Sequence, residues 1–442
     1  MPASTPATST TPLRIAVLAD SDTRWKWGAL TAHRIAPRDD AQEALSLSGF
    51  LLRGRATPTP RQLAEVGVEA ESLREVTSVE FLRAMAEESY DIVVLALVGG
   101  GVQAMLHGLK RVWEGRADRP VVVTGYVGVV YEKLADGLLL RHGADLVLAN
   151  SRQDAERFRS VYEGVGADAS AVTEVALPFL GGAAYEGEHD PYTVVFAVQP
   201  SVPDSRKDRT YLLNRLIKHA RLHPEREVLL KLRSQPGEHT THIEEQPYQK
   251  LVQRLAPPPN FRLVYGNMGE VLDRTDLLVT ISSTAALESL HRRIPTVVLT
   301  DLGVREVLGN HHFVGSGCLA SWDQLDDGHR PSPDPEWVAR QGVVADGSYA
   351  TAFDAARERI AKLLAGALPP LTPYYTPATA PGYLPGILAR HHLGPDGSPL
   401  PGAPAADKEP GPVRQIVRRA ARGAYRHGVQ RVAPVIRRMG EL

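Results

Sequence analysis

Residues 276–290 place hydroxyl side chains where a buried strand would pass into a helix. The apolar run 277–281 predicts the strand, and Ser282, Ser283 and Thr284 follow it directly. The first turn of a helix presents unpaired backbone N–H groups and a partial positive charge, so it can hold a phosphate. The hydroxyls would add donors at the same place. Serine and threonine also cap helices in many proteins, and both interpretations stay open here.

A second pair of candidate phosphate ligands follows from another predicted strand, residues 228–232. Lys231 and Arg233 are two residues apart, and the alternation along a strand makes their side chains point the same way. Arg233 could grip a phosphate with its planar guanidinium fork, and Lys231 could act as a point charge. The alternative is two solvated bases at a strand edge.

The first half of the chain offers candidates for a general base and for acceptor contacts. Asp20 and Asp22 follow the strand predicted over residues 13–19, and either carboxylate could take a proton from an acceptor hydroxyl. Trp25 and Trp27 lie in the same loop, where indole rings beside charged groups suit stacking on a sugar. The alternative is a capped loop whose tryptophans pin the next helix.

A later loop, which follows the strand predicted over residues 120–124, adds further candidates. We expect Tyr126 and Tyr131 to contact the acceptor, and Glu132 is a second candidate base. Three glycines at 99–101 end another strand, where they allow either a close approach of a ligand or a tight turn. They lack the spacing of a dinucleotide-binding fingerprint.

Strands alternate with helices along both halves of the chain. In the first half, apolar runs predict strands over residues 13–19, 44–52, 91–98, 120–124, 145–149 and 172–177. In the second half they predict strands over residues 193–198, 228–232, 262–264, 277–281 and 294–300. This alternation predicts an α/β fold of two Rossmann-like domains, each with a parallel sheet covered on both faces. Residues 181–191 indicate a linker, so ligands would bind in a cleft between the carboxyl ends of the two sheets.

The composition indicates a globular protein of a reducing compartment. Of the 442 residues, 43% are hydrophobic and 23% are charged, and the one cysteine, Cys318, excludes a disulfide framework. Residues 1–12 are rich in Ser, Thr, Pro and Ala, and we expect them to be disordered and not a secretory signal. The histidines lack the spacing of metal ligands, so we expect neither an obligatory metal nor a cofactor.

The tail 413–442 makes the charge distribution uneven. The whole chain has a formal net charge of −1, whereas residues 412–442 hold eight arginines and a single acid, Glu441. A basic stripe at helical spacing is formed by Arg414, Arg418, Arg422 and Arg426. Basic amphipathic helices are typical of membrane surfaces, so we expect residues 413–438 to bind an anionic membrane. An inert arm and, with less weight, a nucleic-acid contact are the alternatives.

The second half resembles the second domain of GT-B glycosyltransferases. The resemblance rests on the strand that carries Lys231, with Pro236 shortly after it, on the Ser-Ser-Thr turn and its helix with Glu288, and on the following Ile-Pro-Thr-Val run. It covers residues 190–320, and the first half in architecture alone. The resemblance is closest to bacterial enzymes of capsular and cell-wall glycans, such as the polysialyltransferase and capsule Kdo-transferase groups. The chain is also similar to an actinobacterial family of glycosyltransferases.

This resemblance implies roles for individual residues. In the capsular enzymes a His-Pro pair after the lysine strand and a hydroxyl pair at the later helix contact the donor phosphate. The hydroxyl pair corresponds to Ser282 and Ser283, and Glu288 stands where many GT-B enzymes bind the donor ribose or nearby backbone. Residues 233–236 read Arg-Ser-Gln-Pro, so the histidine is missing and its role falls to Arg233 or is lost.

The resemblance implies a glycosyltransferase, and the missing metal-ligand spacing and the basic tail add the expectation of a metal-independent, cytoplasmic enzyme at the inner membrane face. It would move a sugar from a nucleotide-sugar donor, with a CMP-linked sugar as one candidate, to a cell-envelope glycan or its lipid-linked precursor. The expected parts are an acceptor domain over 13–180, a nucleotide-sugar domain over 192–367, a Pro/Gly-rich wrap and linker over 368–412 and the basic amphipathic tail. Two alternatives remain: a nucleotide-sugar 2-epimerase, and a non-catalytic protein that binds a glycan or nucleotide.

Overall fold

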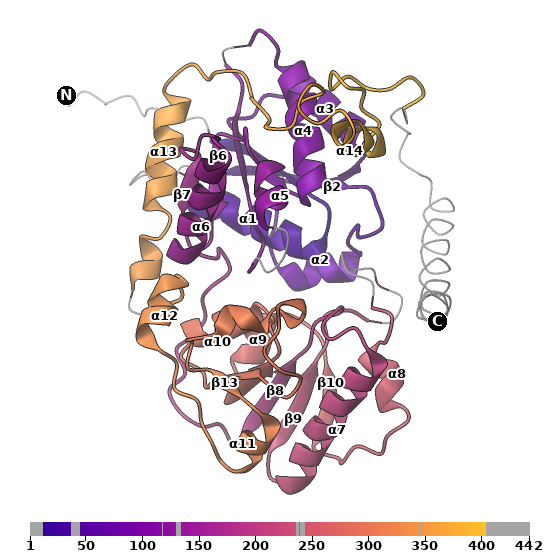
Figure 1. Cartoon of the computed structure of the whole chain (residues 1–442), viewed down its shortest axis with the longest axis vertical. Coiled ribbons are helices and arrows are strands. Elements are labelled where there is room, and N and C mark those ends of the chain that lie inside the picture. The colour runs from indigo at the N-terminus through magenta and orange to yellow at the C-terminus, as the bar shows by residue number, and fades with distance from the viewer. Residues whose placement is uncertain are drawn as a thin grey trace, which may run out of the picture.

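Two α/β lobes are stacked along the long axis of the molecule (Figure 1). The computed structural model describes residues 12–36, 45–116, 118–129, 134–235, 238, 244–344 and 347–403. The predicted base Glu132, the predicted acceptor contact Tyr131 and the basic tail 413–442 lie outside the described residues.

The first lobe is built on a seven-stranded parallel sheet with the order β3-β2-β1-β4-β5-β6-β7. Its strands are β1 (Arg14–Ala19), β2 (Ser46–Leu52), β3 (Ser72–Val76), β4 (Ile92–Ala96), β5 (Val121–Gly125), β6 (Leu146–Ala149) and β7 (Val172–Glu174). Every residue of β4 and β5 is buried, because helices cover both faces of the sheet. This explains why these strands read as continuous apolar runs in the sequence.

Six helices of the first lobe connect these strands: α1 (Asp22–Ile35), α2 (Pro60–Val66), α3 (Ser78–Glu87), α4 (Gly99–Val112), α5 (Leu134–Leu139) and α6 (Arg152–Gly164). The Ser21 side chain caps α1 by accepting a hydrogen bond from the backbone of Arg24. Gly28 lets α1 lie directly on the sheet, since a Cβ there would stand 2.7 Å from a Val17 methyl. The start of α1 is thereby fixed at the carboxyl end of β1.

The second lobe contains a six-stranded parallel sheet with the order β10-β9-β8-β11-β12-β13. The strands are β8 (Thr193–Ala197), β9 (Glu227–Lys231), β10 (Phe261–Val264), β11 (Leu277–Thr280), β12 (Thr296–Leu299) and β13 (Leu319–Ala320). Its α-helices are α7 (Arg206–Leu222), α8 (Tyr248–Val252), α9 (Met268–Leu272), α10 (Ala285–His291), α11 (Trp322–Asp326) and α12 (Pro335–Arg340). The short 3-10 helices η1 (Glu306–Leu308), η2 (Asn310–Phe313) and η3 (Ser348–Ala350) complete this part of the chain.

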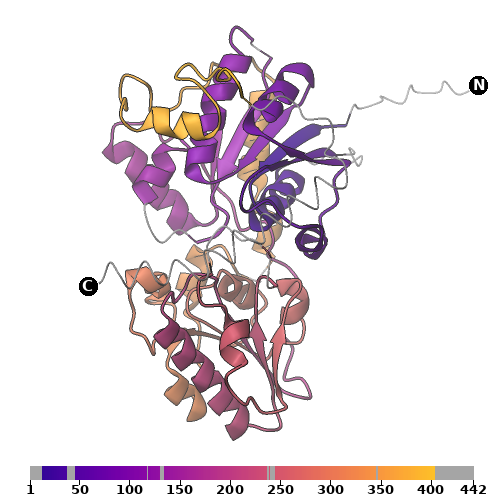
Figure 2. The ribbon, with the colours of Figure 1, turned by 90° about the vertical axis from the view of Figure 1, so that its right-hand side faces the viewer.

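The chain returns to the first lobe after α12 (Figures 1 and 2). Helix α13 (Asp354–Leu364) packs on α1, β5 and β7 and contributes Phe353, Ala356 and Ile360 to the core there. Helix α14 (Leu384–Arg390) packs on α4. We expected α13 to belong to the second domain with 192–367. The apolar side of α13 instead completes the core of the first lobe.

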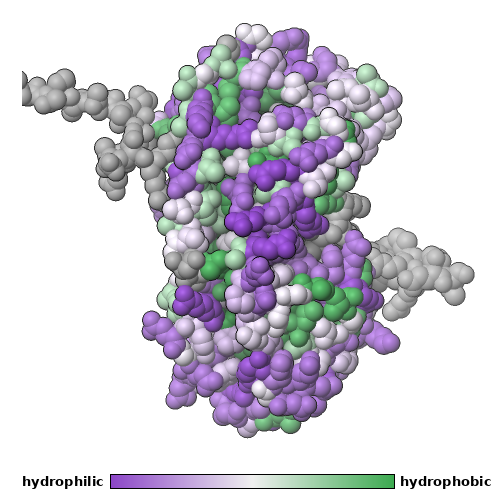
Figure 3. Space-filling view, turned by 60° about the vertical axis from the view of Figure 1, so that its left-hand side comes forward, coloured by the Kyte–Doolittle hydropathy of each residue, from purple (hydrophilic) through white to green (hydrophobic). Residues whose placement is uncertain are grey.

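The predicted fold class is confirmed: the described chain forms two Rossmann-like lobes of the GT-B type, and the carboxyl ends of their strands meet at the boundary between them. Strand β3 was not predicted because it lies at a sheet edge and reads Ser-Leu-Arg-Glu-Val, with only its last residue buried. Among the described residues, no helix combines the length and apolarity needed to cross a membrane. Figure 3 shows hydrophilic residues over much of one face, with hydrophobic residues gathered on the second lobe just below the lobe boundary.

Candidate functional site

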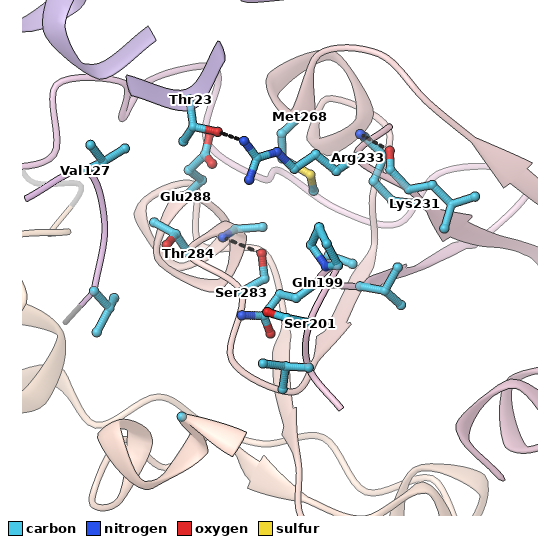
Figure 4. A pocket seen from close by; sticks show the side chains of 18 of the residues that line it. Thr23, Val127, Gln199, Ser201, Lys231, Arg233, Met268, Ser283, Thr284 and Glu288 are labelled. Carbon is cyan, nitrogen blue, oxygen red and sulfur yellow. Dashed lines mark hydrogen bonds between the residues drawn. The ribbon is translucent and has the colours of Figure 1, made fainter. Parts of the chain in front are cut away.

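A cavity of about 890 Å³ opens between the two lobes (Figure 4). The first lobe contributes the start of α1, part of α2 and the loop after β5. The second lobe contributes the loops that follow β8, β9, β10, β11 and β12. The cavity therefore lies at the sheet edges where open α/β folds bind ligands.

The hydroxyl-rich turn after β11 reaches this cavity with two of its three residues. Ser283 and Thr284 line the cavity, and the backbone N–H of Ser283 donates to Thr280 Oγ1 at 3.1 Å. Thr284 begins α10 without capping it through its side chain. Gly128 of the first lobe passes so close that a Cβ there would stand 2.7 Å from Thr284 Oγ1. The turn is thus held at the point where the lobes meet.

Ser282 does not line the cavity, and its assignment to the donor phosphate is wrong for this structure. It is 1% exposed, and its hydroxyl oxygen lies 3.0 Å from Gln199 Oε1 and 2.5 Å from the Leu308 carbonyl oxygen. Both partners belong to loops that form cavity walls. The Ser282 side chain points into the protein, as the alternation along the strand directs it, and its hydroxyl holds these two loops on the side away from the cavity.

Lys231, the last residue of β9, lines the cavity although it is only 8% exposed. Its Nζ donates to the Leu232 carbonyl at 2.9 Å. Burial lowers the pKa of Lys231 to about 8, since desolvation disfavours the charged amine. Arg233 lines the same cavity, as the two-residue spacing predicted.

Glu288 lines the cavity from α10 and is 8% exposed. Burial raises its pKa, and the positive charge of Lys26 opposes this shift. Lys26 belongs to α1 of the first lobe, and its Nζ lies 3.8 Å from Glu288 Oε2 and 4.8 Å from the centre of the Phe179 ring. Sequence reasoning missed Lys26. The available signal was its position one helical turn after Asp22, which puts both side chains on one face of α1.

The two predicted aspartates have different surroundings. Asp20 does not line the cavity: Oδ1 accepts from Arg24 at 2.8 Å, and Oδ2 accepts from the backbone N–H of Val98 at 3.0 Å. Asp22 lines the cavity, and its Oδ1 lies 2.6 Å from Nη2 of Arg233 on the other lobe. The structure therefore assigns Asp20 to holding the end of β1, and it brings Asp22 to the cavity.

The expected acceptor contacts of the first lobe are wrong for the three described residues. Trp25 and Trp27 are 1% and 0% exposed, and Trp27 Nε1 donates to Asn150 Oδ1 at 3.4 Å. Tyr126 does not line the cavity. Its hydroxyl is buried and its ring lies 4.0 Å from the Arg141 guanidinium. Trp25 and Trp27 lie on the buried side of α1 and pin this helix to the core, which is the alternative that the sequence left open for the tryptophans.

Among the described residues, one group has side chains of the types that ligate metals, and it lies outside the cavity. His219, His223 and Asp326 bring their ligand atoms within 4.8 Å of one another. Asp326 already accepts from His219 at 2.8 Å and lies 3.3 Å from Arg215 and 3.5 Å from Lys218. The neighbouring cations balance this carboxylate, so the group is an ion-pair network in which His219 is buried and Asp326 is partly buried.

Two further contacts join the lobes beside the cavity. The Arg61 guanidinium of α2 binds the Glu238 carboxylate, and Nδ2 of Asn267 donates to the Glu65 carbonyl at 3.0 Å. Together with the Asp22–Arg233 and Lys26–Glu288 pairs, these contacts hold the two sides of the cavity together.

Comparisons with solved structures agree with this architecture. The chain is similar to the UDP-GlcNAc 2-epimerase from Methanocaldococcus jannaschii, with 9% identity over 80% of this chain and 100% of that chain and a TM-score of 0.50. It is similar to the UDP-GlcNAc 2-epimerase from Neisseria meningitidis, with 10% identity, coverages of 80% and 100% and a TM-score of 0.44. The spinosyn rhamnosyltransferase SpnG follows with 12% identity, coverages of 79% and 97% and a TM-score of 0.39. At 9% identity the first of these similarities shows the fold alone.

A search of curated protein sequences found no match to this chain. A protein-family model does match it, over residues 15–363, which include both sheets and every described residue of the cavity. The matched range spans well over half of the sequence, so the chain belongs to the family described as "Putative glycosyltransferase (DUF6716)".

Proposed function

We propose that this glycosyltransferase-family protein transfers a sugar from a nucleotide-sugar donor to a cell-envelope glycan or its lipid-linked precursor. The observation that carries the proposal is the desolvated Lys231 ammonium in the cavity wall, in a cavity also lined by Ser283 and Thr284. A buried cation is costly unless it is paired. The charges of Glu65 and Glu288 offset only part of this cost, and an anionic ligand would add a direct partner.

The donor phosphate would lie between β9 and α10. Lys231 supplies a charge there, and the described residues give its three N–H donors one acceptor, the Leu232 carbonyl. Ser283 and Thr284 supply hydroxyls, and the Ser283 hydroxyl oxygen also accepts from the backbone N–H of Ala285 at 3.2 Å. Arg233 supplies a guanidinium that can grip a phosphate in two-point fashion. A nucleoside phosphate leaving group would thus meet positive charge from the protein itself, without requiring a metal.

The carboxylate of Glu288 would accept a hydroxyl of the donor, on its ribose or on its sugar. It lies in the same cavity wall as Lys231 and Thr284, and Lys26 keeps a cation beside it. A buried carboxylate that is paired with a lysine can still accept further hydrogen bonds through its remaining lone pairs.

Asp22 is the candidate base for the acceptor hydroxyl. Among the three carboxylates predicted for this role, two lie in the described residues, and of these Asp22 is the one that lines the cavity. In the reaction, the acceptor O–H would pass its proton to Asp22 while the acceptor oxygen bonds to the anomeric carbon of the donor. The bond from that carbon to the phosphate oxygen would break, and the electron pair would leave with the nucleoside phosphate.

Thermal stabilisation of the purified full-length chain by a panel of CMP-, UDP- and GDP-sugars tests the donor proposal. We expect one nucleotide class to raise the Tm, and the Lys231→Met variant to lose this response. Lys362→Met, at an exposed position on α13, is the matched control and should respond like the wild type. A wild-type chain that no nucleotide sugar stabilises would refute the proposal.

Product analysis then separates transfer from epimerisation. A transferase consumes donor only when an acceptor is present, apart from slow hydrolysis, whereas a 2-epimerase converts the nucleotide sugar without any acceptor. We expect free nucleotide to be released in proportion to glycosylated acceptor. Conversion of donor to its 2-epimer would instead assign the cavity to the epimerase reaction.

We also propose that residues 413–438 attach the enzyme to an anionic membrane surface, where a lipid-linked acceptor would lie. Eight arginines with a single acid over 412–442 support this proposal. The full-length chain should sediment with vesicles that contain anionic phosphatidylglycerol and stay in solution with purely zwitterionic vesicles. Equal binding by a chain that ends at residue 403 would refute the role of the tail.

A further inference from the structure

The Asp22–Arg233 ion pair crosses the cavity between the lobes. It joins the proposed base, Asp22, to a proposed phosphate ligand, Arg233. Nη2 of Arg233 lies 2.6 Å from Asp22 Oδ1, and the same nitrogen also donates to Thr23 Oγ1 (Figure 4). Asp22, Thr23 and Arg233 all line the cavity. The proposed base and a proposed phosphate ligand are therefore bound to each other across the cavity.

We propose that this ion pair is a donor-controlled latch: the donor phosphate takes the Arg233 guanidinium away from Asp22 and so frees the carboxylate for the acceptor hydroxyl. The inference rests on the proposed function and adds a positioning role for Arg233 and an order of binding, with the donor first.

A guanidinium group can bind a phosphate with two parallel hydrogen bonds from either of two edges. One edge is formed by Nη1 and Nη2, and the other by Nε and Nη2. Both edges include Nη2. This nitrogen carries two hydrogens and donates to both Asp22 and Thr23. A two-point grip on a phosphate therefore requires Arg233 to release at least one of these partners.

The electrostatics favour release of Asp22. A phosphate brings more negative charge than one carboxylate, and a carboxylate left beside it would repel it. The pair is also accessible enough for exchange, since the Arg233 and Asp22 side chains are 27% and 14% exposed. Lys26 pairs with Glu288 and Arg233 pairs with Asp22, so Arg233 is the cation whose release frees the proposed base.

The latch would make the base fully available only after the donor has bound. While the ion pair is closed, Arg233 engages Asp22 Oδ1 and weakens it as an acceptor for a proton. When the donor is bound, Oδ1 can accept the proton of the acceptor O–H as the new bond to the anomeric carbon forms. The electron pair of the broken bond leaves with the phosphate, which Arg233 and Lys231 then hold.

A double-mutant cycle on nucleotide binding tests the latch without requiring an acceptor. The Kd values of CMP, UDP, GDP and inorganic pyrophosphate are measured by calorimetry for wild type, Asp22→Asn, Arg233→Met and the double variant. Because Asp22 competes with the ligand for Arg233, Asp22→Asn should bind the best ligand more tightly. A gain of about fivefold is the upper range for a partly exposed ion pair. Arg233→Met should bind more weakly.

The double variant separates a latch from simple repulsion between Asp22 and the phosphate. With a latch, the gain from Asp22→Asn disappears in the Arg233→Met background, because there is no guanidinium to release. An equal gain in both backgrounds would mean repulsion alone and would overturn the inference. Unchanged or weaker binding by Asp22→Asn would overturn it as well.

Conservative variants give a further readout. Asp22→Glu keeps the competing charge and should bind with nearly wild-type affinity, whereas Arg233→Lys keeps a charge without the fork and should bind weakly. Weak binding by Lys231→Met with no effect of any Asp22 or Arg233 variant would refute the latch and leave the proposed donor site intact. No binding of any probe by the wild type would overturn both.

Discussion

The ammonium of Lys26 on the first lobe lies 3.8 Å from the carboxylate of Glu288 on the second lobe, within the cavity that both residues line. Glu288 is buried, and burial raises its pKa while Lys26 opposes the shift. The pair therefore joins the lobes and keeps a carboxylate beside the proposed phosphate ligands. The pair exists only because the two lobes meet, since each lobe supplies one of the two charges.

Replacing Lys26 by Met should lower both stability and donor affinity. The substitution leaves the Glu288 carboxylate without its cation from the first lobe, which we expect to cost about 1–2 kcal/mol of unfolding free energy at neutral pH for a partly exposed pair. Urea unfolding measures this cost. The Lys26→Met and Glu288→Gln double variant should regain part of it, because a neutral amide is cheaper to bury. A cost that is the same with and without the Glu288 carboxylate would contradict the pairing.

The pH dependence of donor binding should report Lys231. Burial lowers the pKa of this residue from 10.5 to about 8, so the ammonium loses its proton as the pH rises through that value. Nucleotide affinity should be flat below about pH 7 and fall by nearly tenfold per pH unit well above about pH 8, if the charged form binds. Calorimetric titrations across this range measure the effect. A flat profile in wild type would contradict this assignment.

The contribution of Lys231 to the free energy of unfolding should rise with pH, whereas its contribution to nucleotide affinity falls. Between about pH 8 and about pH 10.5 the unfolded chain keeps the Lys231 proton that the folded chain has lost. The unfolded state then binds more protons, so the contribution of Lys231 to the unfolding free energy rises with pH in this window. The difference in stability between wild type and Lys231→Met should therefore shift in favour of wild type as the pH increases.

Ser282 and Ser283 are neighbours, and their alanine variants should have different effects. Ser282→Ala removes a buried hydroxyl from the Gln199 side chain and the Leu308 carbonyl, which should cost about 1–2 kcal/mol of stability. Ser283→Ala removes a hydroxyl that lines the cavity and accepts from the backbone N–H of Ala285 at 3.2 Å, so it should weaken nucleotide binding and cost at most about 1 kcal/mol of stability. Thermal unfolding and calorimetry on both variants check this contrast. Loss of affinity in Ser282→Ala without any loss of stability would contradict it.

The sequence predicted the fold well because the buried strands carry strong local signals. Strands such as β4 and β5 are apolar at every position except the last residues of β5, and the helices between them keep their own periodicity. β3 gave no such signal, since an edge strand faces water. The packing of α13 on the first lobe could not be read from its own residues either. An apolar helix face shows that a partner exists and does not identify it.

The site could be predicted on the second lobe and less well on the first. Lys231 and Arg233 follow from strand alternation, and both line the cavity. The ion pairs that Asp22 and Lys26 form with the other lobe depend on how the lobes meet, which no local pattern encodes. The tryptophans were misassigned for a related reason: a loop tryptophan beside charged residues looks the same in sequence whether its ring faces a ligand or the core.

A substitution of Trp27 tests whether its ring faces the core or the acceptor. Its ring is fully buried beneath Gly125, where a Cβ would stand 2.8 Å from the indole, and its Nε1 donates to Asn150. Trp27→Phe should therefore lower the unfolding free energy by about 1–3 kcal/mol, because it leaves a cavity and an unpaired amide oxygen. The KM for the acceptor should stay unchanged once the assay temperature lies well below the Tm. A raised acceptor KM with unchanged stability would return Trp27 to the acceptor site.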